Sequence, residues 1–174
     1  MTKKEFLKAV SNGKVDVLQI FLDAISKIGA GYCVIGGLAV NAYAEPVVSL
    51  DLDVIIAVKD IEPVCKVSAK HFKIQHFEHS INLSSSDSDL RIQLRTDSRY
   101  QAFIPRAKAH NVLGYDMMVA DVKDVLKGKI WAYSDTERRM SKRQKDLADI
   151  LRLIESFPNL TNQLPDTIRK RIEL

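Results

Sequence analysis

The spacing of apolar positions along this chain changes from helical to strand-like and back to helical. Residues 3–11 and 14–28 have apolar side chains every three or four positions, which predicts two amphipathic helices. Short apolar runs separated by turn residues then predict strands at 32–35, 52–58, 72–78, 80–84, 89–96, 110–113 and 117–119. Helices are expected between them at 38–44, 60–69 and 100–108, and after them at 121–132, 135–156 and in two short stretches of the tail.

This order of elements predicts the fold class and the organisation of the chain. It indicates an α/β (α+β) fold, in which a short mixed sheet with flanking helices is followed by a helical C-terminal part. No internal repeat or low-complexity linker divides the sequence. We therefore expect a single domain over residues 1–174, with an α/β core in 1–120 and C-terminal helices in 121–174 packed on that core.

The composition limits the class of protein and its compartment. The 174 residues are 28% charged and 46% hydrophobic, which is typical of a globular domain. No apolar run approaches the roughly 20 residues that a membrane-spanning helix needs, and the first residues do not resemble a signal peptide. Only two cysteines are present, which does not suggest a disulfide framework, so we expect the cytoplasm as compartment. Because no apolar run is long enough to span a membrane, we expect no membrane partner.

Two glycines and two aspartates form the strongest candidate for a chemical site. Gly36 and Gly37 lie between an apolar strand and a short helix, where backbone N–H groups can receive a phosphate. Asp51 and Asp53 are two positions apart on the next strand, so their side chains share one face. Carboxylate oxygens suit Mg²⁺ or Mn²⁺. An anion cradle beside two carboxylates predicts a site for a metal-bound nucleoside triphosphate.

A structural interpretation of the same aspartates stays open. Asp51 could cap its strand while Asp53 pairs with a basic side chain. The strand at 89–96 offers such partners, because Arg91, Gln93 and Arg95 share its polar face. This basic face could offset the two carboxylates, or it could be a track for phosphate or a polynucleotide.

The glycine and aspartate segments resemble the nucleotidyltransferase superfamily, which includes DNA polymerase beta and the minimal nucleotidyltransferases. The signature of that family is a hydrophobic residue with Gly-Gly or Gly-Ser, a spacer, and Asp-hydrophobic-Asp/Glu-hydrophobic. The matching segments are Ile35–Gly37 and Asp51–Val54, with residues 38–50 as the spacer. The resemblance implies that the mixed sheet is of the nucleotidyltransferase type.

The C-terminal helices resemble those of the AbiEii-like (abortive-infection toxin) branch of this superfamily. In that branch a lysine-bearing helix precedes an arginine-containing turn and a second helix with Lys-Asp and a further Asp. The matching positions here are Asp124, Lys129, Lys145, Asp146 and Asp149. This likeness implies a component of a toxin–antitoxin or defence system, with RNA or a protein as acceptor or antitoxin partner.

The resemblance also implies roles for individual residues in metal-dependent transfer of a nucleoside monophosphate to an acceptor hydroxyl. Asp51 and Asp53 would be the catalytic metal ligands for Mg²⁺ or Mn²⁺. Gly36 and Gly37 would receive the β- and γ-phosphates of the nucleoside triphosphate. Lys145 would contact a phosphate as a point charge.

One position departs from the family pattern. Active members carry a third carboxylate on a later strand, and its counterpart here is Gln93, which is a poor Mg²⁺ ligand and no base. Asp97 lies on the same face if the strand extends that far. The alternative function is therefore a catalytically weakened member of the family that binds nucleotide, RNA or a protein partner.

Two further features each allow two interpretations. The basic residues of segment 137–145 form either a solvated helix face or a surface that overlooks the nucleotide cleft. Trp131 and Tyr133 either pack the helical part against the core or provide a stacking surface for a base.

Overall fold

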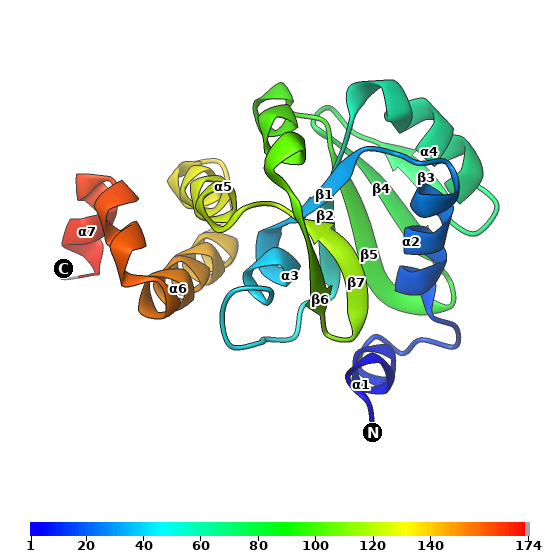
Figure 1. The fold of residues 1–174 in the computed structure, drawn as a ribbon, viewed down its shortest axis with the longest axis horizontal. Coiled ribbons are helices and arrows are strands. Elements are labelled where there is room, and N and C mark those ends of the chain that lie inside the picture. Colours follow the sequence, from blue (N-terminus) through cyan, green and yellow to red (C-terminus); the bar gives the residue numbers. More distant parts are fainter. Residues whose placement is uncertain (173–174) are drawn as a thin grey trace.

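Seven strands form one mixed sheet in the computed structural model, which describes residues 1–172 (Figure 1). The strands are β1 (Tyr32–Ile35), β2 (Asp51–Ile56), β3 (Lys73–His76), β4 (Ser80–Ser85), β5 (Ser88–Arg95), β6 (Lys108–Val112) and β7 (Tyr115–Val119). Their order across the sheet is β3-β4-β5-β2-β1-β7-β6. Strand β2 is antiparallel to β1 and parallel to β5, and β1 is parallel to β7. The predicted mixed α/β sheet is confirmed.

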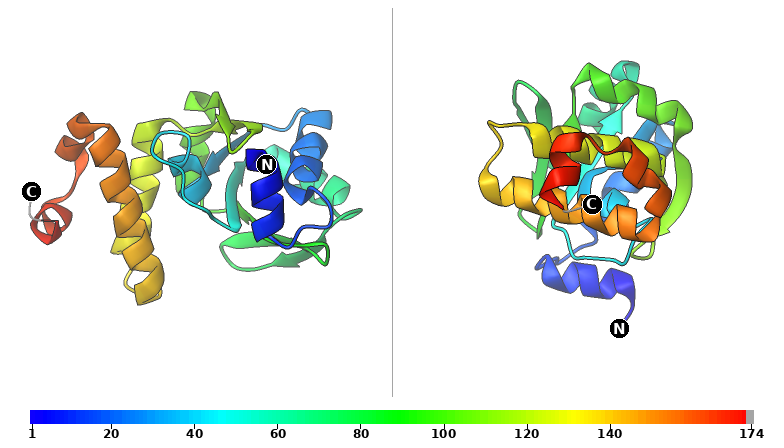
Figure 2. Two further views of the ribbon diagram at one scale, coloured as in Figure 1. Left: turned by 90° about the horizontal axis from the view of Figure 1, so that it is seen from below. Right: turned by 90° about the vertical axis from the view of Figure 1, so that its left-hand side faces the viewer.

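Helices flank this sheet and extend from one end of it. The helices are α1 (Lys3–Val10), α2 (Val17–Lys27), α3 (Gly36–Val40), α4 (Ile61–Ser68), α5 (Val122–Ser134), α6 (Met140–Ser156) and α7 (Asp166–Arg171), with 3-10 helices η1 (Val58–Asp60), η2 (Ser98–Arg106) and η3 (Pro158–Gln163). Helices α2 and α4 lie side by side at the sheet, whereas α5, α6 and α7 gather beyond α3 (Figures 1 and 2). The predicted helical C-terminal part is confirmed.

Two helices begin later in the sequence than predicted, and polar side chains explain both differences. Helix α2 begins at Val17 rather than at residue 14, because the Asp16 carboxylate accepts a hydrogen bond from the Gln19 N–H at 3.0 Å and caps the helix. Helix α6 begins at Met140 rather than at residue 135. The Asp135 carboxylate accepts from the Glu137 N–H at 3.0 Å, and this local turn competes with the first helical turn.

The apolar pattern of β5 explains how this strand is held in the sheet. Leu90, Ile92 and Leu94 are all buried, whereas the residues between them are more exposed, so the predicted alternation is confirmed. Strand β5 lies between β4 and β2. Its polar face therefore carries Arg91 and Arg95 alongside the polar residues of β2.

A buried ion-pair cluster joins α5 to α6. Lys129 of α5 is 7% exposed, and its Nζ lies 2.9 Å from Asp146 Oδ1 and 2.7 Å from Asp149 Oδ2. Arg138 pairs with Asp146 at 2.7 Å, and Arg152 pairs with Asp149 at 2.8 Å. Burial opposes the charge of Lys129, but the two carboxylates more than offset it and hold the pKa of Lys129 above its ordinary value.

Within residues 1–172, none of the helices combines the length and apolar character that crossing a bilayer requires.

We predict that Lys129→Met lowers the free energy of unfolding by about 3 kcal/mol, because it leaves two buried carboxylates short of positive charge. Urea denaturation at pH 7 measures this loss. The exposed lysine on the same helix provides the control, and Lys127→Met is expected to change the free energy of unfolding by less than about 0.5 kcal/mol.

The same ion pairs predict a pH dependence. Because folding raises the pKa of Lys129, its contribution is fully present below the ordinary value of 10.5 and is lost as the pH rises through the folded value. The wild-type protein should therefore lose more stability than Lys129→Met between pH 10 and pH 12. Equal losses in the two proteins would contradict this assignment.

Candidate active site

Strand β2 presents its two aspartates on one face in the middle of the sheet. Asp51 and Asp53 are partly exposed, whereas Leu52 and Val54 between and after them are fully buried. The antiparallel pairing of β1 and β2 places Asp53 opposite Ile35, the last residue of β1. Helix α3 starts at the next residue, so the carboxylate of Asp53 lies beside the glycine pair.

Gly36 makes the close approach of these segments possible. Its φ is +72°, a conformation that L-amino acids with a side chain rarely adopt. A Cβ atom at this position would lie 2.5 Å from Asp53 Oδ2. At Gly37 an added Cβ would come no closer than 3.5 Å to another atom, the Ser49 Oγ. The first glycine is therefore required by its contact with Asp53, and the second is not.

Basic side chains neutralise both carboxylates. Asp51 Oδ1 lies 2.8 Å from Arg91 Nη2, and its Oδ2 lies 3.3 Å from Lys142 Nζ of α6. Arg95 donates to Asp53 Oδ1 from Nε at 3.0 Å and from Nη2 at 2.9 Å. The structure thus contains the ion pairs expected if the basic face of β5 offsets the charge of the aspartates.

Gln93 lies on the polar face of β5, beside the aspartates of β2. The parallel register of β2 and β5 aligns Gln93 with Asp53, and Asn82 of β4 lies opposite Gln93 on the other side. The side chain of β5 in register with Asp53 is therefore a neutral amide and not a carboxylate. Within residues 1–172, no three His, Cys, Asp or Glu side chains come together as a metal-binding group.

Asp97 is paired with Arg99, and Lys145 is exposed. The Asp97 carboxylate is bound in a bidentate manner by Arg99, whose Nη2 lies 2.7 Å from Oδ2 and whose Nε lies 3.2 Å from Oδ1. The side-chain hydrogen bonds from Arg99 hold the pKa of Asp97 below its ordinary value. Lys145 is exposed on α6, and Lys142, nearly one turn earlier, is the lysine that reaches Asp51. The sequence left open whether this basic surface overlooks the cleft or is a solvated helix face, and it did not single out Lys142.

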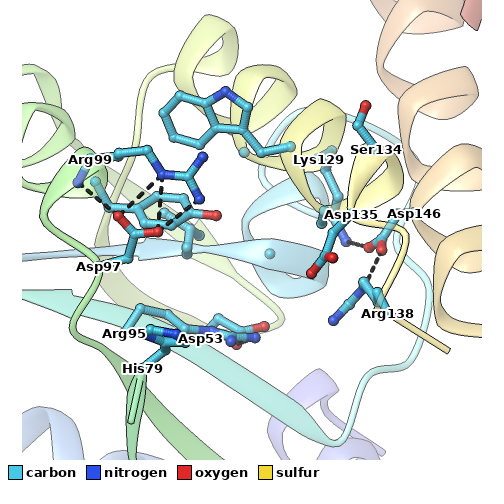
Figure 3. Close-up of a pocket in the computed structure, with 16 residues that line it drawn as sticks. Asp53, His79, Arg95, Asp97, Arg99, Lys129, Ser134, Asp135, Arg138 and Asp146 are labelled. Atoms are coloured by element: carbon cyan, nitrogen blue, oxygen red, sulfur yellow. Dashed lines mark hydrogen bonds and ion pairs between the residues drawn. The ribbon is translucent and has the colours of Figure 1, made fainter.

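A cavity of about 620 Å³ lies between the sheet and the C-terminal helices. Figure 3 shows its charged lining in three groups, which are Asp53 with Arg95 and His79, Asp97 with Arg99, and Lys129 with Arg138 and Asp146. The lining also includes Gly36 and the aromatic residues Tyr100 and Trp131. The volume falls in the range of small-molecule sites in proteins.

The charges of this cavity are arranged as neighbouring pairs of opposite sign. Arg95 pairs with Asp53, Arg99 pairs with Asp97, and Asp146 receives both Lys129 and Arg138. Arg95, Arg99 and Arg138 all line this cavity. Such a lining is suited to a ligand that carries both anionic groups and a polar or aromatic part.

Comparison with known proteins identifies the fold. No protein-family model matches this chain, and no curated protein matches its sequence. The crystal structure of ANT(2'')-Ia in complex with adenylyl-2''-tobramycin has a TM-score of 0.64 at 13% identity, over 90% of this chain and 97% of that one. The lincosamide antibiotic adenylyltransferase LnuA, with lincomycin bound, has a TM-score of 0.56 at 12% identity, over 82% and 99%. An antigenic nucleotidyltransferase-like protein from Paracoccidioides brasiliensis has a TM-score of 0.55 at 16% identity, over 88% and 78%.

These matches show that the chain has the nucleotidyltransferase fold, as the Ile35–Gly37 and Asp51–Val54 segments predicted. At such low identities the likeness carries the fold and not the substrate. Nothing in these comparisons distinguishes the AbiEii-like branch from others.

We predict that Gly36→Ala destabilises the protein by about 3 kcal/mol, because the new methyl group collides with Asp53 and the backbone conformation is strained. Gly37→Ala is the matched control and should cost less than about 1 kcal/mol, since its methyl group meets no close atom. Thermal and urea unfolding of both variants measure the difference. Similar losses for the two would show that Asp53 does not require a glycine at position 36.

Proposed function

We propose that this protein is a nucleotidyltransferase, which transfers a nucleoside monophosphate from a nucleoside triphosphate to an acceptor hydroxyl. The observation that carries the proposal is that Asp53, on the same face of β2 as Asp51, lies against Gly36 at the wall of a nucleotide-sized cavity. The nucleotidyltransferase fold of the chain supports this proposal.

The donor set of β2 fits a divalent metal. Mg²⁺ in nucleotide-dependent enzymes is usually held by one or two carboxylates together with phosphate oxygens and water. Asp51 and Asp53 would provide the two carboxylates, and Gln93 a weaker amide oxygen. When bound, Mg²⁺ or Mn²⁺ would supply charge neutralisation at the triphosphate.

Basic side chains near the aspartates suit the phosphate groups. Arg91 and Lys142 are 61% and 40% exposed, so each can leave Asp51 and turn toward a phosphate. Arg95 already lines the cavity beside Asp53. We infer that these cations and the N–H groups of Gly36 and Gly37 orient the triphosphate, with Lys142, which contacts Asp51, rather than the exposed Lys145 as the first lysine to reach it.

We also infer that the protein belongs to the AbiEii-like branch. Three of the residues that carry this resemblance, Lys129, Asp146 and Asp149, form the buried cluster between α5 and α6. A fourth, Asp124, pairs instead with Arg106 at 2.8 Å. This branch favours RNA or a protein as acceptor, an antitoxin as partner and the cytoplasm as compartment.

A second function has an observation in its favour. The residue aligned with Asp53 is Gln93, and Asp53 itself is bound by Arg95. A site that lacks a third carboxylate and neutralises the other two with arginine and lysine can bind a nucleotide without transferring it. A nucleotide-binding component of a defence system is therefore the alternative to an active transferase.

The experiment that tests the proposal is a thermal shift assay of the wild-type protein and Asp53→Asn, with each of the four nucleoside triphosphates and with or without Mg²⁺ or Mn²⁺. We expect a metal-dependent stabilisation of about 2.7 kcal/mol at a hundredfold excess over Kd, and its loss in Asp53→Asn. Asp23→Asn on the far helix α2 is the control for the change in charge. A shift that needs no metal and survives in Asp53→Asn would favour the binding protein, and no shift with any nucleotide would refute both.

We further predict that Gln93→Asp strengthens Mn²⁺ binding roughly tenfold, because it restores a charged ligand in register with Asp53. Gln75→Asp, on the exposed edge strand β3, adds the same charge away from the site and should leave Mn²⁺ affinity unchanged. Isothermal titration with MnCl₂ measures both. An unaltered affinity in Gln93→Asp would remove position 93 from the metal site.

A further inference from the structure

Trp131 is a fixed aromatic wall of the cavity that contains Asp53. Its ring is stacked on Phe103, with centroids 5.8 Å apart and an interplanar angle of 14°. Tyr100 contacts it edge-on at 5.3 Å. Helix α5 is also packed tightly on Tyr100, because a Cβ at Gly128 would lie 3.4 Å from that ring. The indole is therefore held by its neighbours, although it borders an open space.

Arg99 adds a charged planar group to this wall. Its guanidinium carbon lies 4.7 Å from the centre of the Trp131 ring, which is a cation–π distance. The bidentate pair with Asp97 restrains the guanidinium group in this place. Figure 3 shows Asp97 and Arg99 on one side of the cavity and Asp53 and Arg95 on the other.

This combination has a chemical preference. Indole and guanidinium surfaces both stack on nucleobases, because every base has a polarisable face. Anionic phosphate groups gain little from an aromatic ring. The other side of the cavity, with Asp53, Gly36 and Arg95, has the groups that suit phosphate and metal. The two sides thus match the two ends of a nucleotide.

We propose that Trp131 and Arg99 form the nucleobase subsite of this cavity. The proposal rests on the proposed function, since it assumes that a nucleoside triphosphate places its phosphates at Gly36 and Asp53. The base then stacks against the Trp131–Arg99 wall. Stacking tolerates every base, so the subsite holds all four nucleotides.

Tryptophan fluorescence tests the subsite directly, because Trp131 is the only tryptophan of the chain. We expect saturable quenching or a spectral shift when ATP, GTP, CTP or UTP is titrated with Mg²⁺. Inorganic tripolyphosphate with Mg²⁺ carries the same phosphates without a base and should leave the emission almost unchanged. Equal responses to tripolyphosphate and ATP would overturn the proposal.

Variants separate stacking from phosphate binding. Isothermal titration should show that Trp131→Leu raises the Kd for ATP roughly tenfold and leaves the Kd for tripolyphosphate unchanged. Trp131→Phe should retain most of the affinity. Arg99→Ala keeps the fluorophore and removes a side chain that is 57% exposed, so it tests the subsite even if Trp131→Leu fails to fold. It should weaken ATP binding several-fold, again without an effect on tripolyphosphate.

Lys127→Ala is the matched control. Its Nζ lies 5.3 Å from the same ring, but unlike Arg99 this residue is not part of the cavity lining, so the Kd for ATP should not change. ATP binding that is strong in titration but equal in the wild type, Trp131→Leu and Arg99→Ala would overturn the subsite and leave the proposed function intact. Absence of binding by any nucleotide to the wild type would overturn both.

Discussion

The register between β1 and β2 brings the carboxylate of Asp53 against the first residue of α3, and the remainder of the site is arranged around this contact. A Cβ at position 36 would lie 2.5 Å from Asp53 Oδ2, so the chain can turn from β1 into α3 here only with glycine. This turn directs α3 toward the C-terminal helices, which contact it from the other side. The distance between the sheet and those helices, and with it the cavity, follows from this close approach.

Charge compensation is the second requirement of the site. Two carboxylates on adjacent same-face positions of a central strand are stable only with countercharges nearby. Arg91 and Arg95 come from the parallel strand β5, and Lys142 comes from α6, more than eighty residues after β2. These pairs stabilise the aspartates without a metal. A metal that binds Asp51 and Asp53 would have to displace these arginine and lysine side chains. The displacement is favourable if the displaced side chains then pair with the phosphates of the nucleotide.

The C-terminal helices both close the cavity and supply part of its lining. A buried cluster of Lys129, Asp146 and Asp149 holds α5 against α6. Two residues after Lys129 on the same helix, Trp131 lines the cavity. Removing one member of such a cluster is costly, because it leaves a buried charge without its partner. Structural integrity and the shape of the ligand site therefore depend on the same helix pair.

The sequence by itself determined the elements, the glycine pair and the two aspartates, because helical and strand periodicity and the short Ile35–Gly37 and Asp51–Val54 segments are local patterns. It also predicted that Gln93 lies on the polar face of its strand, since strand alternation fixes which face a residue occupies. It could not determine that Lys142 rather than Lys145 reaches Asp51, or that Arg99 lies over Trp131. These contacts depend on how α5 and α6 pack against the sheet, because the position and rotation of a helix decide which of its side chains reaches a given strand. Only the tertiary structure decided them, because distances between remote segments are set by packing and not by local sequence.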